Sequence, residues 1–162
     1  MTMDAVLFSV MGNYDAAIME RIMEFISLSA FPIFAASAMF FGGRMKAVDY
    51  VAVMATTISF SVFFQQFFAR PRPEGAILRG LDGPYSFPST HSSSAFAWAS
   101  CMGKNFRKLA IIFYVFAALV AVSRVYVGVH YPVDVAAGAI LGSAISRFVT
   151  RKNGIRKSGK PR

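Results

Sequence analysis

Cysteine, histidine and acidic residues are all scarce in this chain of 162 residues. There is one cysteine, Cys101, so no internal disulfide can form, and there are two histidines, too few for a zinc site of the usual type. Cys101 lies in an apolar stretch and is expected to be a packing residue. Charged residues make up 15% of the chain, against about 25% in soluble proteins. This composition excludes an ordinary soluble domain.

Long uncharged runs are present instead. Hydrophobic residues make up 56% of the chain, and the mean hydropathy is +0.51. Residues 25–43 and 50–69 carry no charge, and each run is close to the ~20 residues that a helix needs to cross a bilayer. Residues 1–15 lack the basic start of a signal peptide, so we expect the spans themselves to direct insertion. The sequence therefore predicts an integral membrane protein.

The predicted fold is an all-α helical bundle of five transmembrane helices, or six if the N-terminal segment inserts. Residues 4–12 are amphipathic and are expected to form an interfacial helix. A loop rich in proline and glycine, residues 70–88, precedes Ser89, a hydroxyl residue suited to cap the next helix. One membrane-embedded domain, residues 1–150, is followed by a basic tail, residues 151–162, that we expect to be disordered. The expected spans are roughly residues 25–42, 47–68, 90–103, 106–123 and 132–150.

The net charge of +9 does not predict nucleic-acid binding, because the basic residues cluster at the ends of the spans. Seven of the 17 lie in residues 147–162. With five spans, the positive-inside rule places this tail in the cytoplasm, together with the turns at residues 44–46 and 104–108. The opposite, extracytoplasmic side then holds the 70–88 loop and the 124–131 turn. Basic residues on that side are expected to bind an anion; they are Arg70, Arg72, Arg79 and Arg124.

The most informative stretch is residues 123–134, where Ser123, Arg124, His130 and Asp134 stand within twelve residues. Charged groups near bilayer hydrocarbon are costly and therefore indicate function. Arginine matches phosphate oxygens with a planar set of donors. Histidine can act as a nucleophile or as an acid and base near neutral pH, and an aspartate four residues later can fix its tautomer. Together these residues indicate phosphoryl transfer.

Three motifs in this order resemble the signature of the phosphatidic acid phosphatase type 2 superfamily, which is related to vanadium haloperoxidases. That signature reads Lys-x6-Arg-Pro, then Pro-Ser-Gly-His, then Ser-Arg-x5-His-x3-Asp. The third motif is complete here in residues 123–134. The second lies at residues 88–91, with Thr90 in place of glycine, and the first keeps Arg72-Pro73 but has Gln65 in place of lysine.

The resemblance implies a catalytic mechanism and its residues. His130 would attack phosphorus and form a phosphohistidine, and Asp134 would hold the other ring nitrogen of His130. His91 would protonate the leaving oxygen and then activate water. The phosphoryl oxygens would be bound by Arg72, Arg124, Ser89 and the backbone amide of Thr90, at a helix N-terminus. No metal and no other cofactor is implied.

Some residues are further candidates for binding the substrate phosphate, and some of the proposed site residues have a simpler, structural alternative role. Gln65 can donate hydrogen bonds, but the site then lacks one charge that Arg70 would have to supply. Arg70 is equally suited to be an interfacial anchor, and Arg79 could meet a second phosphate. Ser123 completes the third motif. The simpler alternatives are a helix-terminal charge for Asp134, an anchor for Arg124 and a helix cap for Ser89.

The predicted function is a membrane phosphatase acting on a lipid phosphate or diphosphate at the outer leaflet of the cell membrane. The layout is most similar to small undecaprenyl-diphosphate phosphatases, which favours a polyprenyl diphosphate as substrate. Phosphatidylglycerophosphate and phosphatidate are the alternative substrates. A protein that binds lipid phosphates without catalysis is the alternative from another class. The pattern at Gly138 and Gly142 allows close helix packing, which we expect within one protomer, and the oligomeric state stays open.

Overall fold

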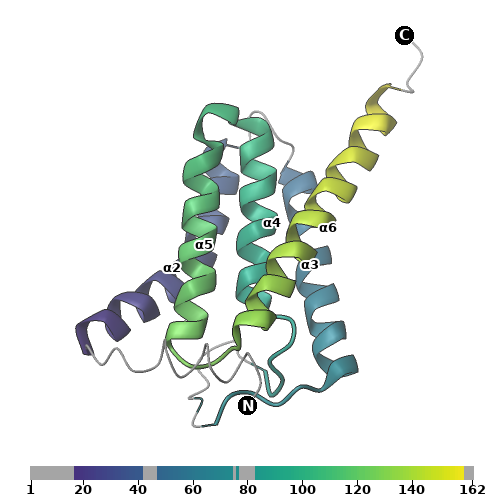
Figure 1. Cartoon of the computed structure of the whole chain (residues 1–162). Helices are drawn as coiled ribbons and strands as arrows, with labels where there is room; N and C mark the ends of the chain where they lie inside the picture. The colour runs from purple at the N-terminus through teal and green to yellow at the C-terminus, as the bar shows by residue number, and fades with distance from the viewer. Residues whose placement is uncertain (1–16, 42–46, 75, 77–82, 159–162) are drawn as a thin grey trace.

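In a computed structural model the chain forms a bundle of helices, and residues 17–41, 47–74, 76 and 83–158 are described (Figure 1). Within these ranges there is no named strand, and extended pairing is limited to an isolated bridge between Pro71 and Tyr85. The all-α fold class is confirmed. The predicted interfacial segment, residues 4–12, lies outside the described residues. In chain order the elements are α2 (Ala17–Phe41), α3 (Ala47–Phe68), α4 (Thr90–Asn105), the 3-10 turn η1 (Arg107–Leu109), α5 (Ala110–Tyr126) and α6 (Pro132–Ser158).

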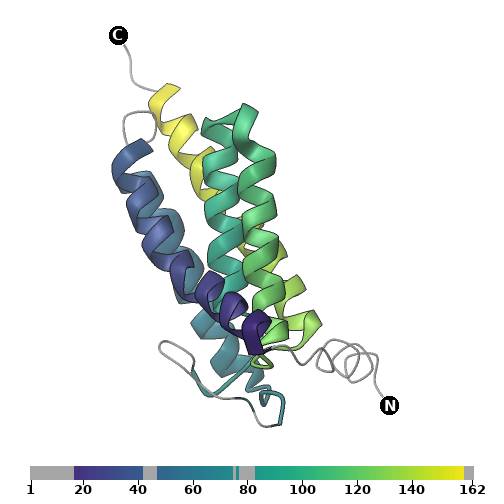
Figure 2. The ribbon, with the colours of Figure 1, turned by 90° about the vertical axis from the view of Figure 1, so that its left-hand side faces the viewer.

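Helix α4 lies at the centre and contacts α2, α3, α5 and α6 (Figures 1 and 2). Twelve of its sixteen residues are buried, and most of these are serine or alanine. Small residues let helix backbones approach closely inside a membrane. The helix begins as predicted, because Ser89 is its N-cap and its side chain accepts a hydrogen bond from the Ser92 amide at 3.4 Å.

The approach of α6 to α4 depends on two glycines. A Cβ added at Gly138 would lie 2.7 Å from the Ser89 carbonyl oxygen, and one at Gly142 would overlap the carbonyl oxygen of Ser93. The helices are also joined by a hydrogen bond from the Ser92 hydroxyl to the Val135 carbonyl, at 2.7 Å. The small-residue pattern of α6 therefore packs within one protomer, as expected.

A hydrophobic core fills the space between α2, α4 and α5. Its centre is Trp98, whose ring packs against Phe34 and Phe113 with centroid distances of 5.1 and 5.2 Å. The indole nitrogen of Trp98 donates a 2.8 Å hydrogen bond to the Ser37 hydroxyl. A buried indole needs such a partner, so this bond fixes α2 against α4 at the level of the core.

Three segments are long and apolar enough to cross a membrane: Val48–Phe68, Arg107–Tyr126 and Pro132–Arg151. The protein is therefore a multi-pass membrane protein. Helix α4 is shorter, at 16 residues, and polar, and α2 begins at Ala17, ahead of the expected first span at residues 25–42. The count of five spans stays a prediction.

The last helix corrects one expectation about the chain end. We expected α6 to stop near Thr150 and a disordered tail to follow, but the helix continues to Ser158. Residues 151–158 contain no proline, and their four arginine and lysine residues are good helix formers, which offsets the weaker Asn153 and Gly154. The start of the tail is therefore a continuation of α6.

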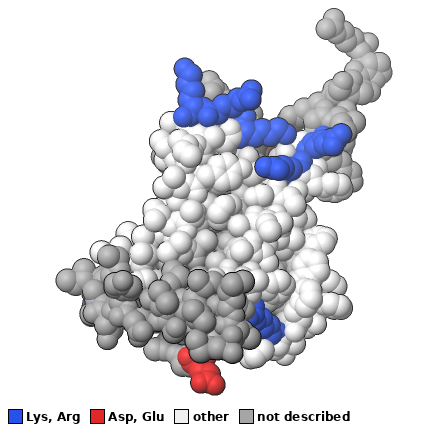
Figure 3. All heavy atoms as spheres, in the orientation of Figure 1, with Lys and Arg blue, Asp and Glu red and all other residues white. Residues whose placement is uncertain are grey.

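Charge is distributed unevenly along the bundle. Figure 3 shows most of the visible blue side chains gathered where α4, α5 and α6 carry their basic ends, and a red one with a smaller blue patch at the opposite end. The exposed acidic residue at that opposite end is Glu74, in the loop after α3. The exposed basic residues at the first of these ends are Lys104, Arg107, Lys108, Arg147 and Arg151, and Arg21, near the start of α2, is exposed as well.

Candidate active site

The three sequence motifs meet at the end of the bundle opposite to the basic ends of α4, α5 and α6. They come from the segment after α3, from the N-terminus of α4 and from the turn between α5 and α6. A cavity of about 240 Å³ lies between them. Its apolar lining includes Phe31, Ile58 and Val62. The predicted site residues that line the cavity are Gln65, Arg72, Thr90, His91 and His130.

The imidazole of His130 is almost fully buried and is held at both nitrogens. Its Nδ1 lies 2.8 Å from the carbonyl oxygen of Ser86. A carbonyl can only accept a hydrogen bond, so Nδ1 carries the proton and Nε2 is unprotonated. The Nη1 atom of Arg72 lies 3.2 Å from Nε2 and can donate to it. The ring therefore presents an unprotonated nitrogen next to an arginine.

Arg72 is fixed by two backbone carbonyls from different segments of the chain. Its Nε donates to the Gly83 carbonyl at 2.8 Å, and its Nη1 donates to the Val129 carbonyl at 2.7 Å. These bonds tie the loop after α3 to the turn that holds His130. The guanidinium is thereby placed at the cavity, next to Nε2.

Asp134 lies in the first turn of α6 and is fully buried. Its Oδ1 accepts a hydrogen bond from Nη1 of Arg70 at 2.8 Å, and its Oδ2 accepts one from the Tyr131 amide at 2.9 Å. Oδ2 also lies 3.6 Å from Nδ1 of His130, beyond hydrogen-bond length, so the short bond to Nδ1 comes from Ser86. Asp134 stands beside the imidazole as a negative charge.

The electrostatic setting of His130 favours its neutral form. Burial, the largest cause, lowers the pKa of the imidazole, and the positive charges of Arg72 and Arg124 lower it further. The carboxylate of Asp134 acts in the opposite direction without reversing the shift. The unprotonated Nε2 is thus maintained near neutral pH.

His91 lies in the first turn of α4 and is 8% exposed. Its ring meets the ring of Phe31 from α2 edge to face, with centroids 5.1 Å apart. Both histidines of the chain line the same cavity. The structure therefore brings together the two side chains that the sequence proposed as nucleophile and as acid and base.

Gln65 occupies the position at which the resemblance calls for lysine. Its Nε2 donates to the Pro88 carbonyl at 2.9 Å and to the Thr90 hydroxyl at 3.0 Å. The side chain thus connects α3 to the start of α4, and it borders the cavity. Arg70, the expected substitute for the missing charge, contacts Asp134 and lies over the Tyr131 ring, 4.3 Å from its centroid.

The remaining predicted residues lie deeper or outside the described part. Ser89 is fully buried as the cap of α4, and its amide donates to the Asp134 carbonyl at 3.1 Å. Ser123 is also buried, and its hydroxyl donates to the Val120 carbonyl at 2.7 Å. Arg124 is buried in the last turn of α5, within electrostatic reach of His130. Arg79 lies outside the described residues.

The sequence profile described as "PAP2 superfamily" matches residues 46–157, more than half of the chain. The chain belongs to the PAP2 superfamily. Its PAP2 region runs from α3 to the end of α6 and contains every residue assigned to the cavity above except Phe31. The predicted family is confirmed.

Individual PAP2 relatives match smaller parts of the chain. A decaprenylphosphoryl-5-phosphoribose phosphatase of Mycobacterium tuberculosis is 35% identical over 105 residues, covering 63% of this chain and 58% of the relative. An undecaprenyl-diphosphatase of Sulfolobus acidocaldarius is 46% identical over 63 residues, covering 38% of this chain and 31% of the relative. The chain spans about half the length of the first curated relatives that it matches.

A solved PAP2 structure shares the fold. The transmembrane PAP2 type phosphatidylglycerolphosphate phosphatase of Bacillus subtilis superposes with a TM-score of 0.75 and 24% sequence identity. The match covers 97% of this chain and 86% of that one. The helical arrangement is therefore that of a transmembrane PAP2 protein.

Three features of this PAP2 site were missed by sequence reasoning. The Ser86 and Gly83 carbonyls hold His130 and Arg72, but a backbone carbonyl has no residue-type signal. Phe31 lies in α2, before the first motif, and one phenylalanine among 17 does not stand out. The contact of Arg70 with Asp134 joins positions 64 apart in the chain, and their opposite charges were the available signal.

Proposed function

We propose that this protein is a phosphatase that hydrolyses a lipid phosphate or diphosphate, with His130 as the nucleophile. The observation that supports this best is the orientation of the His130 imidazole. Its Nδ1 proton is directed to the Ser86 carbonyl, so the unprotonated Nε2 lies at the cavity beside Arg72. A neutral imidazole with a fixed tautomer is the form that can attack phosphorus.

In the first step, Nε2 of His130 attacks the terminal phosphorus, and the bond from phosphorus to the leaving oxygen breaks. His91, in its protonated form, gives a proton to that oxygen. The phosphohistidine carries a positive charge on its ring, and the Asp134 carboxylate, 3.6 Å from Nδ1, stabilises it. Arg72 donates to the phosphoryl oxygens as their charge grows.

In the second step, His91, now neutral, takes a proton from a water molecule. The water oxygen attacks the phosphohistidine, the bond from phosphorus to Nε2 breaks, and inorganic phosphate leaves. His91 is protonated again, and His130 returns to its neutral state. The cycle consumes one water and uses no oxidant or reductant.

The proposed chemistry needs no metal ion, because arginine and histidine supply the positive charge and the proton. Within the described residues, no group of three histidine, cysteine, aspartate or glutamate side chains is placed to hold a metal. The test is direct: turnover should persist after exhaustive treatment with a chelator. Loss of activity on chelation, with recovery on adding one divalent cation, would contradict a mechanism based on these side chains alone.

A polyprenyl diphosphate is the substrate that we favour. The 46% identity to an undecaprenyl-diphosphatase lies in a short region and supports this choice. The apolar lining formed by Phe31, Ile58 and Val62 suits a lipid next to its phosphate. Phosphatidylglycerophosphate or phosphatidate would fit the same chemistry and is the alternative substrate, in line with the fold shared with the Bacillus subtilis enzyme.

The alternative function, binding of lipid phosphates without catalysis, is favoured by one observation: Gln65 stands where the motif has lysine. Its amide is used to connect α3 to α4, and no lysine stands there to add charge. A protein that binds lipid phosphates without hydrolysis would keep Arg72 and lose turnover. Phosphate release separates the two functions.

The experiment uses purified protein in detergent and a panel of undecaprenyl diphosphate, phosphatidylglycerophosphate and phosphatidate. We expect phosphate release, fastest from the diphosphate, and its loss in His130→Gln. Gln66→Ala is the matched control, because Gln66 also borders the cavity but has no assigned role. Equal turnover in His130→Gln would remove the proposed nucleophile, and binding without turnover of any lipid would favour the non-catalytic alternative.

A further inference from the structure

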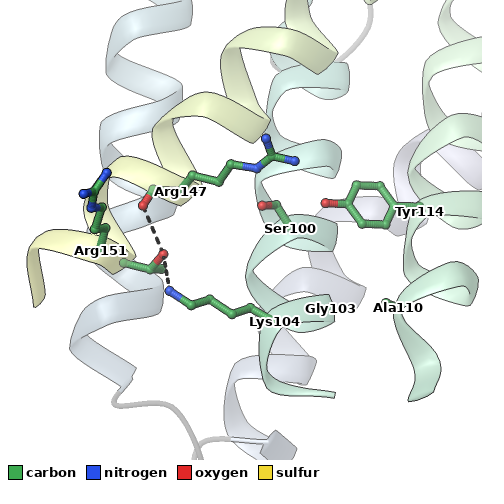
Figure 4. A pocket seen from close by; sticks show the side chains of 8 residues that line it. Ser100, Gly103, Lys104, Ala110, Tyr114, Arg147 and Arg151 are labelled. Atoms are coloured by element: carbon green, nitrogen blue, oxygen red, sulfur yellow. Dashed lines mark hydrogen bonds between the residues drawn. The ribbon is translucent and has the colours of Figure 1, made fainter. Parts of the chain in front are cut away.

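A second cavity lies at the other end of α4, where α4, α5 and α6 come together (Figure 4). Its volume is about 490 Å³, within the range of roughly 300 to 1,000 Å³ that is usual for small-molecule sites. The active-site cavity is at the N-terminus of α4, whereas this one is lined by residues near the C-terminus of the same helix. It is therefore separate from the proposed phosphatase site.

The polar lining of this cavity consists of cations and hydroxyl groups. Within the described part of the chain, no carboxylate lines it. A cavity with positive charge, hydroxyl donors and no carboxylate suits an anion with several oxygens. The cations are Lys104, Arg147 and Arg151, and the hydroxyl groups belong to Ser100, Tyr114 and Thr150.

The side chains are placed so that several can contact one group. Figure 4 shows the Arg147 guanidinium and the hydroxyl groups of Ser100 and Tyr114 directed toward the same space, from three different helices. The Lys104 ammonium lies 3.2 Å from the Thr150 hydroxyl. That hydroxyl donates to the Ser146 carbonyl at 2.7 Å, which leaves its lone pair directed to Lys104. The lysine is thereby held at the edge of the cavity.

Small residues form the side where α4 meets α5. A Cβ added at Gly103 would lie 3.2 Å from the Ala110 Cβ and 3.7 Å from the Tyr114 ring. The helices approach closely at this point. The cavity lies beside this contact, next to Arg147. Arg151 lies one helical turn further along α6.

The surroundings favour a lipid as the source of the anion. On α5, the helix that contributes Tyr114, the neighbouring Ile111 and Val115 are 70% and 52% exposed. In a membrane protein such apolar side chains face lipid chains. Basic pockets between transmembrane helices are suited to anionic headgroups. A headgroup in the cavity could thus have its chains along α5.

We propose that this cavity binds the phosphate group of an anionic phospholipid from the leaflet at the basic end of the bundle. Arg147 contacts the phosphate oxygens together with the hydroxyl groups of Ser100 and Tyr114, and Lys104 adds a second positive charge. This proposal is independent of the phosphatase activity, because it uses none of the residues around His130.

The test measures lipid binding to purified protein by native mass spectrometry, with phosphatidylglycerol and phosphatidylcholine as probes. Phosphatidylglycerol is a phosphodiester without a terminal phosphoryl group, so it is not the proposed substrate. We expect the protein to prefer phosphatidylglycerol, and the double variant Lys104→Gln/Arg147→Gln to lose at least about tenfold in affinity. The matched control is Arg107→Gln/Lys108→Gln, which removes the same charge from exposed residues of η1 that do not line the cavity.

The control double variant should retain the affinity of the unmodified protein. An equal loss in both double variants would overturn the proposal, since it would reduce the effect to net charge. A milder variant, Tyr114→Phe, tests the site without removing charge and should weaken phosphatidylglycerol binding several-fold. Unchanged binding in Tyr114→Phe and in the Lys104/Arg147 variant would also overturn it.

A comparison with inorganic phosphate distinguishes the two possible sources of the bound anion, which are a phospholipid headgroup and free phosphate. Phosphatidylglycerol should raise the thermal unfolding midpoint of the unmodified protein more than that of the Lys104→Gln/Arg147→Gln variant. Inorganic phosphate at the same concentration should change the midpoints of the two proteins equally, because any binding at the proposed active site is common to both. If inorganic phosphate stabilises the unmodified protein more than the variant, and phosphatidylglycerol does not, the assignment to a lipid is wrong.

Discussion

The imidazole of His130 is held by contacts that determine which nitrogen carries the proton. Ser86 accepts from Nδ1 at 2.8 Å, and Arg72 approaches Nε2 at 3.2 Å. Two cations near a buried imidazole disfavour a third positive charge. The residue is therefore neutral before substrate arrives, and Asp134 lies close enough to stabilise the charge that forms later.

The first prediction concerns the pKa of His130. Burial and the neighbouring arginines lower it below the ordinary histidine value of about 6.5. The neutral, nucleophilic form therefore persists as the pH falls through that value, and it is lost only at lower pH. Since the chain has two histidines, the variant His91→Gln gives a single imidazole signal for titration by NMR. Adding Arg72→Gln should move the midpoint upward, and a midpoint above about 6.5 without it would contradict the proposed setting.

The second prediction concerns Arg70, which we infer to be a positioning residue. It reaches the site through Asp134, at 2.8 Å, and does not line the cavity. Arg70→Gln should lower kcat about tenfold, which corresponds to ~1.4 kcal/mol of transition-state stabilisation, and leave KM nearly unchanged. Arg70→Lys, which keeps the charge, should recover part of the loss. A raised KM with unchanged kcat would instead place Arg70 on the substrate phosphate.

The sequence motifs predicted which polar side chains form the site. They did not predict which groups those side chains would contact. His91, His130 and Arg72 could be named from the motifs, because their chemistry suits phosphoryl transfer. The use of Gln65 as a connection from α3 to α4 could not be predicted, since it depends on how two helices meet. A hydrogen bond to a backbone carbonyl is likewise set by the fold.

At the level of elements, α4 is the helix on which the others pack. Its serines and alanines give it low hydrophobicity, yet it is the most enclosed helix described. The start of α4 followed from Ser89 and the preceding prolines, which are local signals. The length of α6 did not follow from the sequence, because residues 151–158 contain no proline to mark its end.

The third prediction tests the contact between α4 and α6. Helix propensity alone predicts that Gly142→Ala stabilises α6, by roughly 1 kcal/mol. The structure predicts the opposite sign, because the new Cβ would overlap the Ser93 carbonyl, and overpacking costs typically about 1–3 kcal/mol. The unfolding midpoint in detergent should therefore fall.

Ala144→Gly provides the comparison for this variant on the same helix. Ala144 is exposed, so propensity should govern there and the substitution should destabilise slightly. A rise in stability for Gly142→Ala would show that the two helices do not approach as closely as described.

For the molecule as a whole, the two ends differ in charge and in chemistry. One end holds the proposed phosphatase site, and the other holds exposed basic residues and the second cavity. The positive-inside rule predicts that the basic end is cytoplasmic. We therefore propose that the active site faces away from the cytoplasm and that the C-terminus lies within it.

The fourth prediction tests this orientation by cysteine labelling in intact cells. The native Cys101 is buried, so the unmodified chain gives a low background. Glu74→Cys, in the loop after α3, should react with a membrane-impermeant maleimide from outside. Lys108→Cys, at the basic end, should react only after lysis. The reverse pattern would place the active site in the cytoplasm.

The formation of phosphohistidine on His130 is the central claim, and trapping it tests the claim most directly. Purified protein would be mixed with a radiolabelled lipid diphosphate, quenched in alkali and digested, and the labelled peptide identified by mass spectrometry. The account predicts the label on the peptide that contains His130, and no label in His130→Gln. A label on His91, or phosphate release without any phosphohistidine, would contradict it.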